Sequence, residues 1–357
     1  MMDKPTKNEP CNLMDARDQI IDKKALLQAL ETSIFDAKDA ADIKARTVAI
    51  LKVQLKAGRE LIGSAVLENP DCAQSARRAY TYLTDQVVQL VYLVAERWLH
   101  PRPNPTAAER LCVMAVGGYG RAEMAPFSDV DLLFLTPYKQ TPWGESMIES
   151  ILYTLWDLRM KVGHATRTVD DCIRLGKGDY TIRTALLENR YLAGEEPLAK
   201  QLESRLWAEL FANTGADFVE AKLDERDKRH NRTGGSRYMV EPNVKEGKGG
   251  LRDLQTLFWI AKYLYHADTP ADLVKQGVFR QDEFDNFLAA EAFLWKTRIV
   301  LHLVTNRPTE QLTFDTQVEV ARALGYKDSH GRRDVEFFMQ DYFRHATHVG
   351  DLTRIFL

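Results

Sequence analysis

The chain has 357 residues, and its 48 lysines and arginines nearly balance its 51 aspartates and glutamates, for a net charge of −3. This length exceeds what one ordinary core serves, so two or three domains are expected. The near-neutral charge argues against a dedicated nucleic-acid-binding protein. No apolar run reaches about 18 residues and no signal-peptide pattern opens the sequence, which argues against a membrane protein and favours a cytoplasmic one.

The cysteines give a second indication of compartment. Cys11, Cys72, Cys112 and Cys172 are widely spaced and form no C-x-x-C pair. This spacing favours neither a zinc cluster nor a disulfide framework, and we expect reduced thiols.

The first third of the chain is expected to be helical after a loose start. Residues 1–30 are mostly polar and are predicted to be disordered or loosely helical. Apolar residues then recur at helical spacing over about 31–62, with Gly63 as the predicted end, and over about 74–99. Residues 31–105 therefore form a predicted helical lead-in.

The middle of the chain alternates between strand and helix signals. Short apolar runs predict strands at 111–116, 130–135, 162–168 and 190–193, and amphipathic patterns predict helices at 145–160 and 181–189. From 196 to 357 almost every segment has helical periodicity. We therefore predict an α+β fold in which residues 106–195 form a small domain with a mixed sheet. A helical domain follows over 196–357.

One motif in this middle segment indicates phosphate and metal chemistry. Gly117 and Gly118 directly follow a predicted strand, and lacking a Cβ they let backbone N–H groups approach a phosphate closely. Asp129 and Asp131, two residues apart at the head of the next strand, should project from the same face. Two adjacent carboxylates repel unless a cation lies between them, and Mg²⁺ prefers carboxylates together with substrate phosphates.

The combination is more specific than its parts, because a Gly-Gly turn or a D-x-D pair alone is usually only a turn or a solvated strand end. No G-x-x-x-x-G-K-[ST] segment is present, which rejects a Walker loop. The glycines also do not follow the G-x-G-x-x-G spacing of a dinucleotide-binding fold.

The extended motif GGYGRAEMAPFSDVDLLFL resembles the DNA polymerase β-like nucleotidyltransferase superfamily, and within it the protein-PII uridylyltransferase/uridylyl-removing enzymes. The segments LWDLRMKVGHATRT, TALLENRYLAG, EPNVKEGKGGLRDLQTLFWIAK and RRDVEFFMQDYFRHATHV are similar to the same family. The resemblance covers roughly residues 75–357 and implies a polymerase β-like nucleotidyltransferase domain.

The resemblance also implies an activity and a partner. Family members transfer UMP from UTP to a tyrosine of the trimeric PII nitrogen-signal protein and release pyrophosphate. They continue into an HD hydrolase domain and paired ACT domains. This sequence contains no His-Asp dipeptide. We therefore expect the HD and ACT domains to be absent and the chain to correspond to the N-terminal transferase portion.

Roles can be predicted for individual residues. Asp129 and Asp131 would be the catalytic and metal-holding pair for Mg²⁺, and Gly117, Gly118 and Ser128 would hold the triphosphate. Arg121 would neutralise phosphate charge or be a surface arginine. In the glycine-rich segment after Glu241, leaning on the resemblance, Lys245, Lys248 and Arg252 would contact the nucleotide, positioned by Asn243 and Asp253; alternatively Asp253 pairs with an arginine in a purely structural loop.

Several questions stay open at this stage. The superfamily usually supplies a third carboxylate from a later strand, and here Glu188 and His164 are the candidates, with a packed structural role for His164 as the alternative. Glu123 is expected to be helix-face charge. Other functions compatible with the motif are transfer of another nucleotide, such as AMP, to another acceptor, and a non-catalytic nucleotide-sensing domain.

Overall fold

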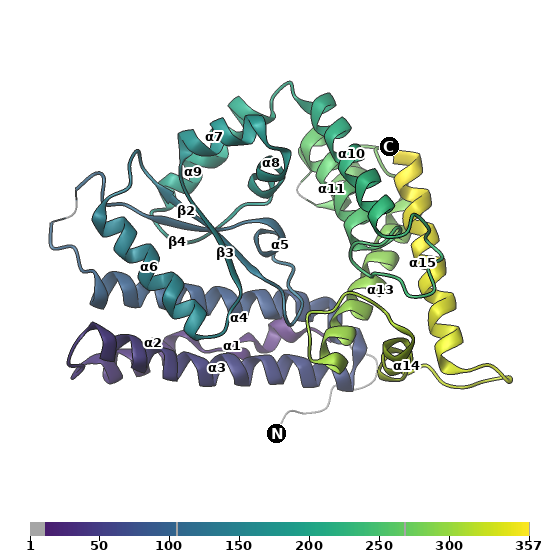
Figure 1. Ribbon diagram of the computed structural model, residues 1–357, viewed down its shortest axis with the longest axis horizontal. Coiled ribbons are helices and arrows are strands. Elements are labelled where there is room, and N and C mark those ends of the chain that lie inside the picture. The colour runs from purple at the N-terminus through teal and green to yellow at the C-terminus, as the bar shows by residue number, and fades with distance from the viewer. Residues whose placement is uncertain (1–10, 105, 268, 357) are drawn as a thin grey trace.

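The computed structural model of the chain describes residues 11–104, 106–267 and 269–356, and it has the α+β architecture that the sequence predicts. Figure 1 shows a small sheet resting on long helices, with the helices of the C-terminal half gathered beside it. The predicted loose segment lies partly outside the described residues, in 1–10. From residue 11 onward the segment is helical and not disordered, because helices begin at Leu13 and Ile20, Ile21 and Leu30 are completely buried.

The lead-in consists of a short helical start and a long antiparallel pair, in the order η1 (Leu13–Ala16), α1 (Arg17–Ile20), α2 (Lys23–Ile34), α3 (Ala40–Glu68), η2 (Pro70–Cys72), α4 (Ala73–Val94) and η3 (Ala95–Leu99). Gly63 was predicted to end a helix, but it lies buried inside α3. A Cβ there would lie 3.1 Å from Cδ2 of Leu303. The glycine is therefore explained by close packing against α13 (Gln281–Thr305), not by a helix stop.

Cys11 and Cys72 form a disulfide, so the prediction that all four thiols are reduced was wrong for this pair. The two residues are 61 positions apart in sequence, but the N-terminal segment packs against the start of α4. There the Ser75 hydroxyl donates to the Cys11 carbonyl (3.2 Å) and accepts the Leu13 N–H (3.1 Å). Tertiary packing thus brings together cysteines whose spacing gave no signal. Cys112 and Cys172 are free and buried.

The sheet has four strands in the order β3-β2-β1-β4, namely β1 (Cys112–Ala115), β2 (Val130–Thr136), β3 (Val162–Thr168) and β4 (Arg190–Gly194). β1 pairs antiparallel with β2 and β4, whereas β2 and β3 are parallel. Side chains alternate between the two faces. Leu132 and Phe134 belong to the core on one face, and Leu133 and Leu135 belong to the core on the other.

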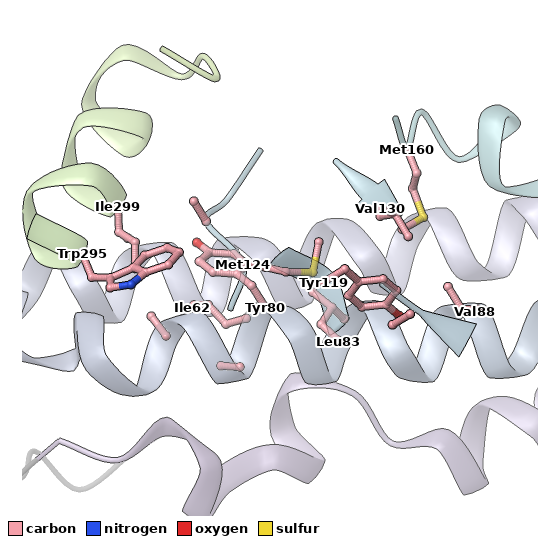
Figure 2. Close-up of a cluster of buried hydrophobic side chains, with 14 of the residues drawn as sticks. Ile62, Tyr80, Leu83, Val88, Tyr119, Met124, Val130, Met160, Trp295 and Ile299 are labelled. Atoms are coloured by element: carbon pink, nitrogen blue, oxygen red, sulfur yellow. The ribbon is translucent and has the colours of Figure 1, made fainter. Parts of the chain in front are cut away.

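Helices cover both faces of this sheet. The long helix α4 and α6 (Pro142–Asp157) lie on one face, and Figure 2 shows Tyr80 and Leu83 of α4 reaching the residues around Tyr119 and Met124. The other face is covered by α7 (Val169–Gly178), α8 (Tyr180–Leu187), α9 (Glu196–Arg205) and η4 (Leu206–Phe211). The sequence pattern did not predict α7.

The regular elements of the C-terminal half are all helices, namely α10 (Gly215–Arg232), α11 (Leu251–Tyr265), α12 (Pro270–Lys275), α13, α14 (Phe314–Ala323) and α15 (Asp334–Phe356) among the described residues. In Figure 2, Trp295 and Ile299 of α13 lie beside Tyr80 of α4. One hydrophobic cluster therefore runs from the lead-in through α4 and α13 to α15. This shared core holds the C-terminal helices against α4, beside the sheet.

Among the described residues, none of the helices has the length and apolar character needed to cross a membrane.

Candidate nucleotide and metal site

The glycine turn lies directly against the strand that carries the acidic pair. After β1 the chain turns into the four-residue helix α5 (Gly117–Gly120), and Gly117 has φ +60°, a conformation that favours glycine. The Val116 N–H donates to the Asp131 carbonyl (3.0 Å), which joins the turn to β2. The backbone thus fixes the glycines and the head of β2 relative to each other.

Asp129 and Asp131 line one cavity, as predicted, although Asp129 lies just before β2 and only Asp131 is within the strand. Asp129 is exposed and Asp131 is half-buried. Burial raises the pKa of Asp131, and the charge of Asp129 raises it further. In the described part of the chain, neither side chain has a hydrogen-bond donor or an ion-pair partner. Their oxygens are therefore left available for a cation.

The cavity that they line has a volume of about 330 Å³, and residues of both the α/β part and the C-terminal helices form its lining. Its walls come from the α5 turn, the head of β2, the start of α11 and one side of α13. The lining residues are Gly118, Tyr119, Arg121, Glu123, Phe127, Ser128, Asp129, Asp131, Lys161, Lys245, Arg252, Gln255, Trp295, Arg298, His302, Pro308 and Glu310.

Arg121 is not a surface arginine, because only 11% of its side chain is exposed. Its Nε donates to Glu123 Oε2 (3.1 Å) and lies 3.4 Å from Glu188 Oε2. Glu123 therefore pairs with Arg121 and Arg77 rather than standing free on a helix face. Burial lowers the pKa of Arg121, but Glu188 and Glu123 outweigh it and the net pKa is raised. Arg121 therefore lines the cavity as a charged guanidinium, paired with Glu123 and Glu188.

Ser128 also lies in the cavity wall, where its Oγ accepts the Ala125 N–H (2.9 Å). This bond occupies an acceptor position and leaves the hydroxyl proton free to be donated.

The glycine-rich segment before α11 places two of its three predicted cations in the cavity. Asn243 Oδ1 accepts the N–H groups of Lys245 (3.1 Å) and Glu246 (2.7 Å), which fixes the turn that carries Lys245. Arg252 follows at the start of α11, where its Nη1 donates to Gln255 Oε1 (2.9 Å). Burial lowers the pKa of both Lys245 and Arg252.

Lys248 lies elsewhere. Its Nζ donates to the Gly235 carbonyl (3.4 Å), and it borders a separate cavity with Arg232 and Arg237. Asp253 is buried and pairs with Arg229 and His230, so the structural alternative holds for this residue.

The structure also adds residues that the sequence pattern did not single out. Lys161 precedes β3, and Trp295, Arg298 and His302 lie on α13. Arg298 holds Glu310 with bonds of 2.7–3.1 Å. Arg298 and His302 are four residues apart, so they lie on the same side of α13, most of whose other buried residues are apolar. These two polar residues were the only sequence signal for this part of the cavity.

Neither Glu188 nor His164, the two candidates for the third carboxylate position, lines the cavity of the acidic pair. Glu188 is buried between two cations. Lys262 Nζ lies 3.9 Å from its Oε1, and Arg121 contacts its Oε2. Burial raises its pKa despite these two cations. His164 is exposed and pairs in register with Leu132, on the face opposite Asp131, with its ring 6.2 Å from that of Trp156.

The residues present fit Mg²⁺ bound together with a substrate. No cluster of three or more His, Cys, Asp or Glu side chains suited to a metal occurs within the described ranges. Two carboxylates without hydrogen-bond donors provide hard oxygen ligands, and Mg²⁺ typically completes its six positions with phosphate oxygens and water. Such an ion would be held weakly until a nucleotide arrives.

Comparisons with known proteins indicate the family to which the chain is related. Residues 217–357 match the family model described as GlnD PII-uridylyltransferase. Over 95% of its length the chain is 59% identical to a bifunctional uridylyltransferase/uridylyl-removing enzyme of Ruegeria pomeroyi, and over 96% it is 57% identical to that of Cereibacter sphaeroides. A protein of the same description from Rhodospirillum rubrum is 49% identical over 94% of the chain.

The chain spans only 36–37% of the length of these relatives. The similarity nevertheless extends over 94–96% of this chain. On these grounds the chain belongs to the GlnD PII-uridylyltransferase family.

Proposed function

We propose that this chain transfers UMP from UTP to a tyrosine of a PII protein, with Mg²⁺ at Asp129 and Asp131. The observation that carries the proposal is a pair of carboxylates without hydrogen-bond donors at the edge of a cavity lined by Arg121, Lys245 and Arg252. The names of the relatives, uridylyltransferase/uridylyl-removing enzymes, supply the nucleotide and the family model supplies the acceptor.

In the proposed reaction the phenolic oxygen attacks the α-phosphorus of UTP. The bond between that phosphorus and the oxygen leading to the β-phosphate breaks, pyrophosphate leaves with the electron pair, and the phenolic proton is released. Bound Mg²⁺ would supply Lewis-acid stabilisation of the phosphate charge. The chain's own contribution is to hold the triphosphate with the glycine turn and the cations, which positions the α-phosphorus.

The direct test incubates the chain with labelled UTP, Mg²⁺ and a PII protein, followed by mass analysis of the PII tyrosine. The expected result is addition of one UMP and loss of transfer in Asp129→Asn and Asp131→Asn, with unchanged far-UV circular dichroism. Asp217→Asn, at an exposed site on α10, is the matched control and should transfer normally. Transfer by the Asp129→Asn/Asp131→Asn double variant at saturating Mg²⁺ would refute the mechanism, and a preference for ATP in competition would refute the nucleotide assignment.

A further inference from the structure

Asp131 borders a second cavity on the side away from the triphosphate site. This groove has a volume of about 310 Å³ and shares only Asp131 with the first cavity, among the described residues. Its floor is formed by Gly163, Ala165 and Arg167 of β3, and its wall by Thr181, Ile182 and Ala185 of α8. Gly117, which was predicted to hold the triphosphate, lines this groove, whereas Gly118 lines the first cavity. Figure 1 shows β3 and α8 next to α5, which carries the glycine turn.

The carboxylate of Asp131 lies between the two cavities. A Cβ at Gly117, on the glycine turn, would lie 3.6 Å from Oδ2, whereas a Cβ at Gly163 would lie 2.5 Å from Oδ1. One oxygen therefore faces the turn and the other lies over the edge strand. A group bound in the groove at Gly163 would reach Oδ1 of the carboxylate that also lines the first cavity.

The floor of the groove is an outer strand of the sheet. β3 pairs with β2 on one side only, in the order β3-β2-β1-β4. An outer strand presents unpaired N–H and C=O groups, and an extended polypeptide can add to it as a further strand. Small residues at Gly163 and Ala165 leave room for a side chain of such a segment beside Asp131.

Arg167 lies at the far end of the groove floor. Gly163, Ala165 and Arg167 pair in register with Asp131, Leu133 and Leu135, so their side chains share the face of Asp131. Arg167 is half-buried and, within the described part of the chain, has no hydrogen bond or ion pair. An uncompensated arginine about 13 Å along a strand from the reaction centre suits an acidic side chain of a bound peptide.

We infer that this groove binds the acceptor segment of the PII protein as an extended strand along β3. The tyrosine would lie at Gly163 beside Asp131, and an acidic residue about four positions away would pair with Arg167. This inference rests on the proposed function, because it assigns the second substrate of the same site.

Two variants of the full chain test it through steady-state transfer from UTP to PII. Ala165→Trp fills the groove while leaving the backbone of β3 intact, and Arg167→Glu reverses the charge at its far end. Arg78→Glu, at an exposed arginine of α4 that lines neither cavity, is the matched control. Binding of Mg²⁺–UTP is measured separately by calorimetry, without PII.

The expected result is a KM for PII raised at least tenfold in both groove variants, with the Kd for UTP within twofold of the parent and Arg78→Glu unaffected. An unchanged KM for PII in both variants would overturn the inference. A raised KM for UTP in Arg167→Glu would also overturn it, because the groove would then belong to the nucleotide. If the parent chain transfers no UMP to PII, the proposed function fails first and the inference fails with it.

Discussion

Gly163 lies directly beneath Asp131, so closely that a Cβ at position 163 would stand 2.5 Å from Oδ1 of the carboxylate. Real Cβ atoms do not approach other atoms to this distance. The two residues are register partners on β3 and β2. The position of the Asp131 carboxylate, which we propose binds Mg²⁺, thus depends on the absence of a side chain on the neighbouring strand.

Gly163→Ala should therefore reduce transfer by about a hundredfold without unfolding the chain, because a displacement of about 1 Å in a reacting group can cost that much. The measurement is kcat/KM for UTP, with thermal unfolding as the check on the fold. Gly178→Ala is the matched control, since a Cβ there meets nothing within 4 Å. Normal transfer by Gly163→Ala would show that Asp131 tolerates movement and that the close contact has no catalytic consequence.

Lys245 and Lys248 should respond differently to the same substitution. Lys245 lies in the cavity with the acidic pair, whereas Lys248 borders a separate one. We expect Lys245→Gln to raise the KM for UTP about tenfold, equivalent to about 1.4 kcal/mol of binding, and Lys248→Gln to change it less than twofold. Initial rates over a UTP titration provide the comparison. Equal effects would mean that the loop rearranges when the nucleotide binds.

Glu188→Gln distinguishes a positioning residue from a metal ligand. Glu188 contacts Arg121, which keeps Glu123 as a second partner. The variant should therefore raise the KM for UTP by about threefold, a fraction of a typical charge-assisted bond, while kcat and the Mg²⁺ dependence stay near those of the parent. A loss of kcat as complete as in Asp131→Asn would instead place Glu188 among the groups that act on the reacting phosphate.

The free energy of unfolding should depend on pH through the carboxylate of Glu310. Burial alone would raise its pKa, but His302 and the Arg298 guanidinium lower it to about 2. Because the unfolded carboxyl has a pKa of about 4.3, the contribution to stability is complete above that value and is lost as the pH falls from about 5 toward 2.

Glu310→Gln should accordingly lower the free energy of unfolding by about 1.5–3 kcal/mol at pH 7, with a smaller difference from the parent at pH 3. Urea unfolding at several pH values measures it. Glu336→Gln, which removes a more exposed ion pair with Arg332, is the control and should cost less than about 1 kcal/mol. A difference that is constant with pH would contradict the predicted role of the Glu310 charge.

The parts of the structure that are local in sequence could be predicted. The two-residue spacing of Asp129 and Asp131 predicted that both side chains lie together, and the period of apolar residues found all four strands and most helices. α7 was missed because its ten residues are flanked by strand and helix signals and include two glycines, although the capping box of Thr168 and Asp171 is a helix-start signal.

The parts that depend on long-range packing could not be predicted. Nothing in the spacing of Cys11 and Cys72 shows that the N-terminal segment returns to the start of α4. Likewise, Arg298 enters the cavity only because α13 packs against α4, and Glu188 is sealed only because Arg121 and Lys262 converge on it.

The two cavities share Asp131 and otherwise have separate linings among the described residues, so the sites proposed for UTP and for the acceptor could be occupied at the same time. We therefore expect a sequential kinetic order, with double-reciprocal plots for the two substrates that intersect instead of running parallel. Pyrophosphate would then leave only after the acceptor has docked, and the chain would never carry a uridylyl group of its own.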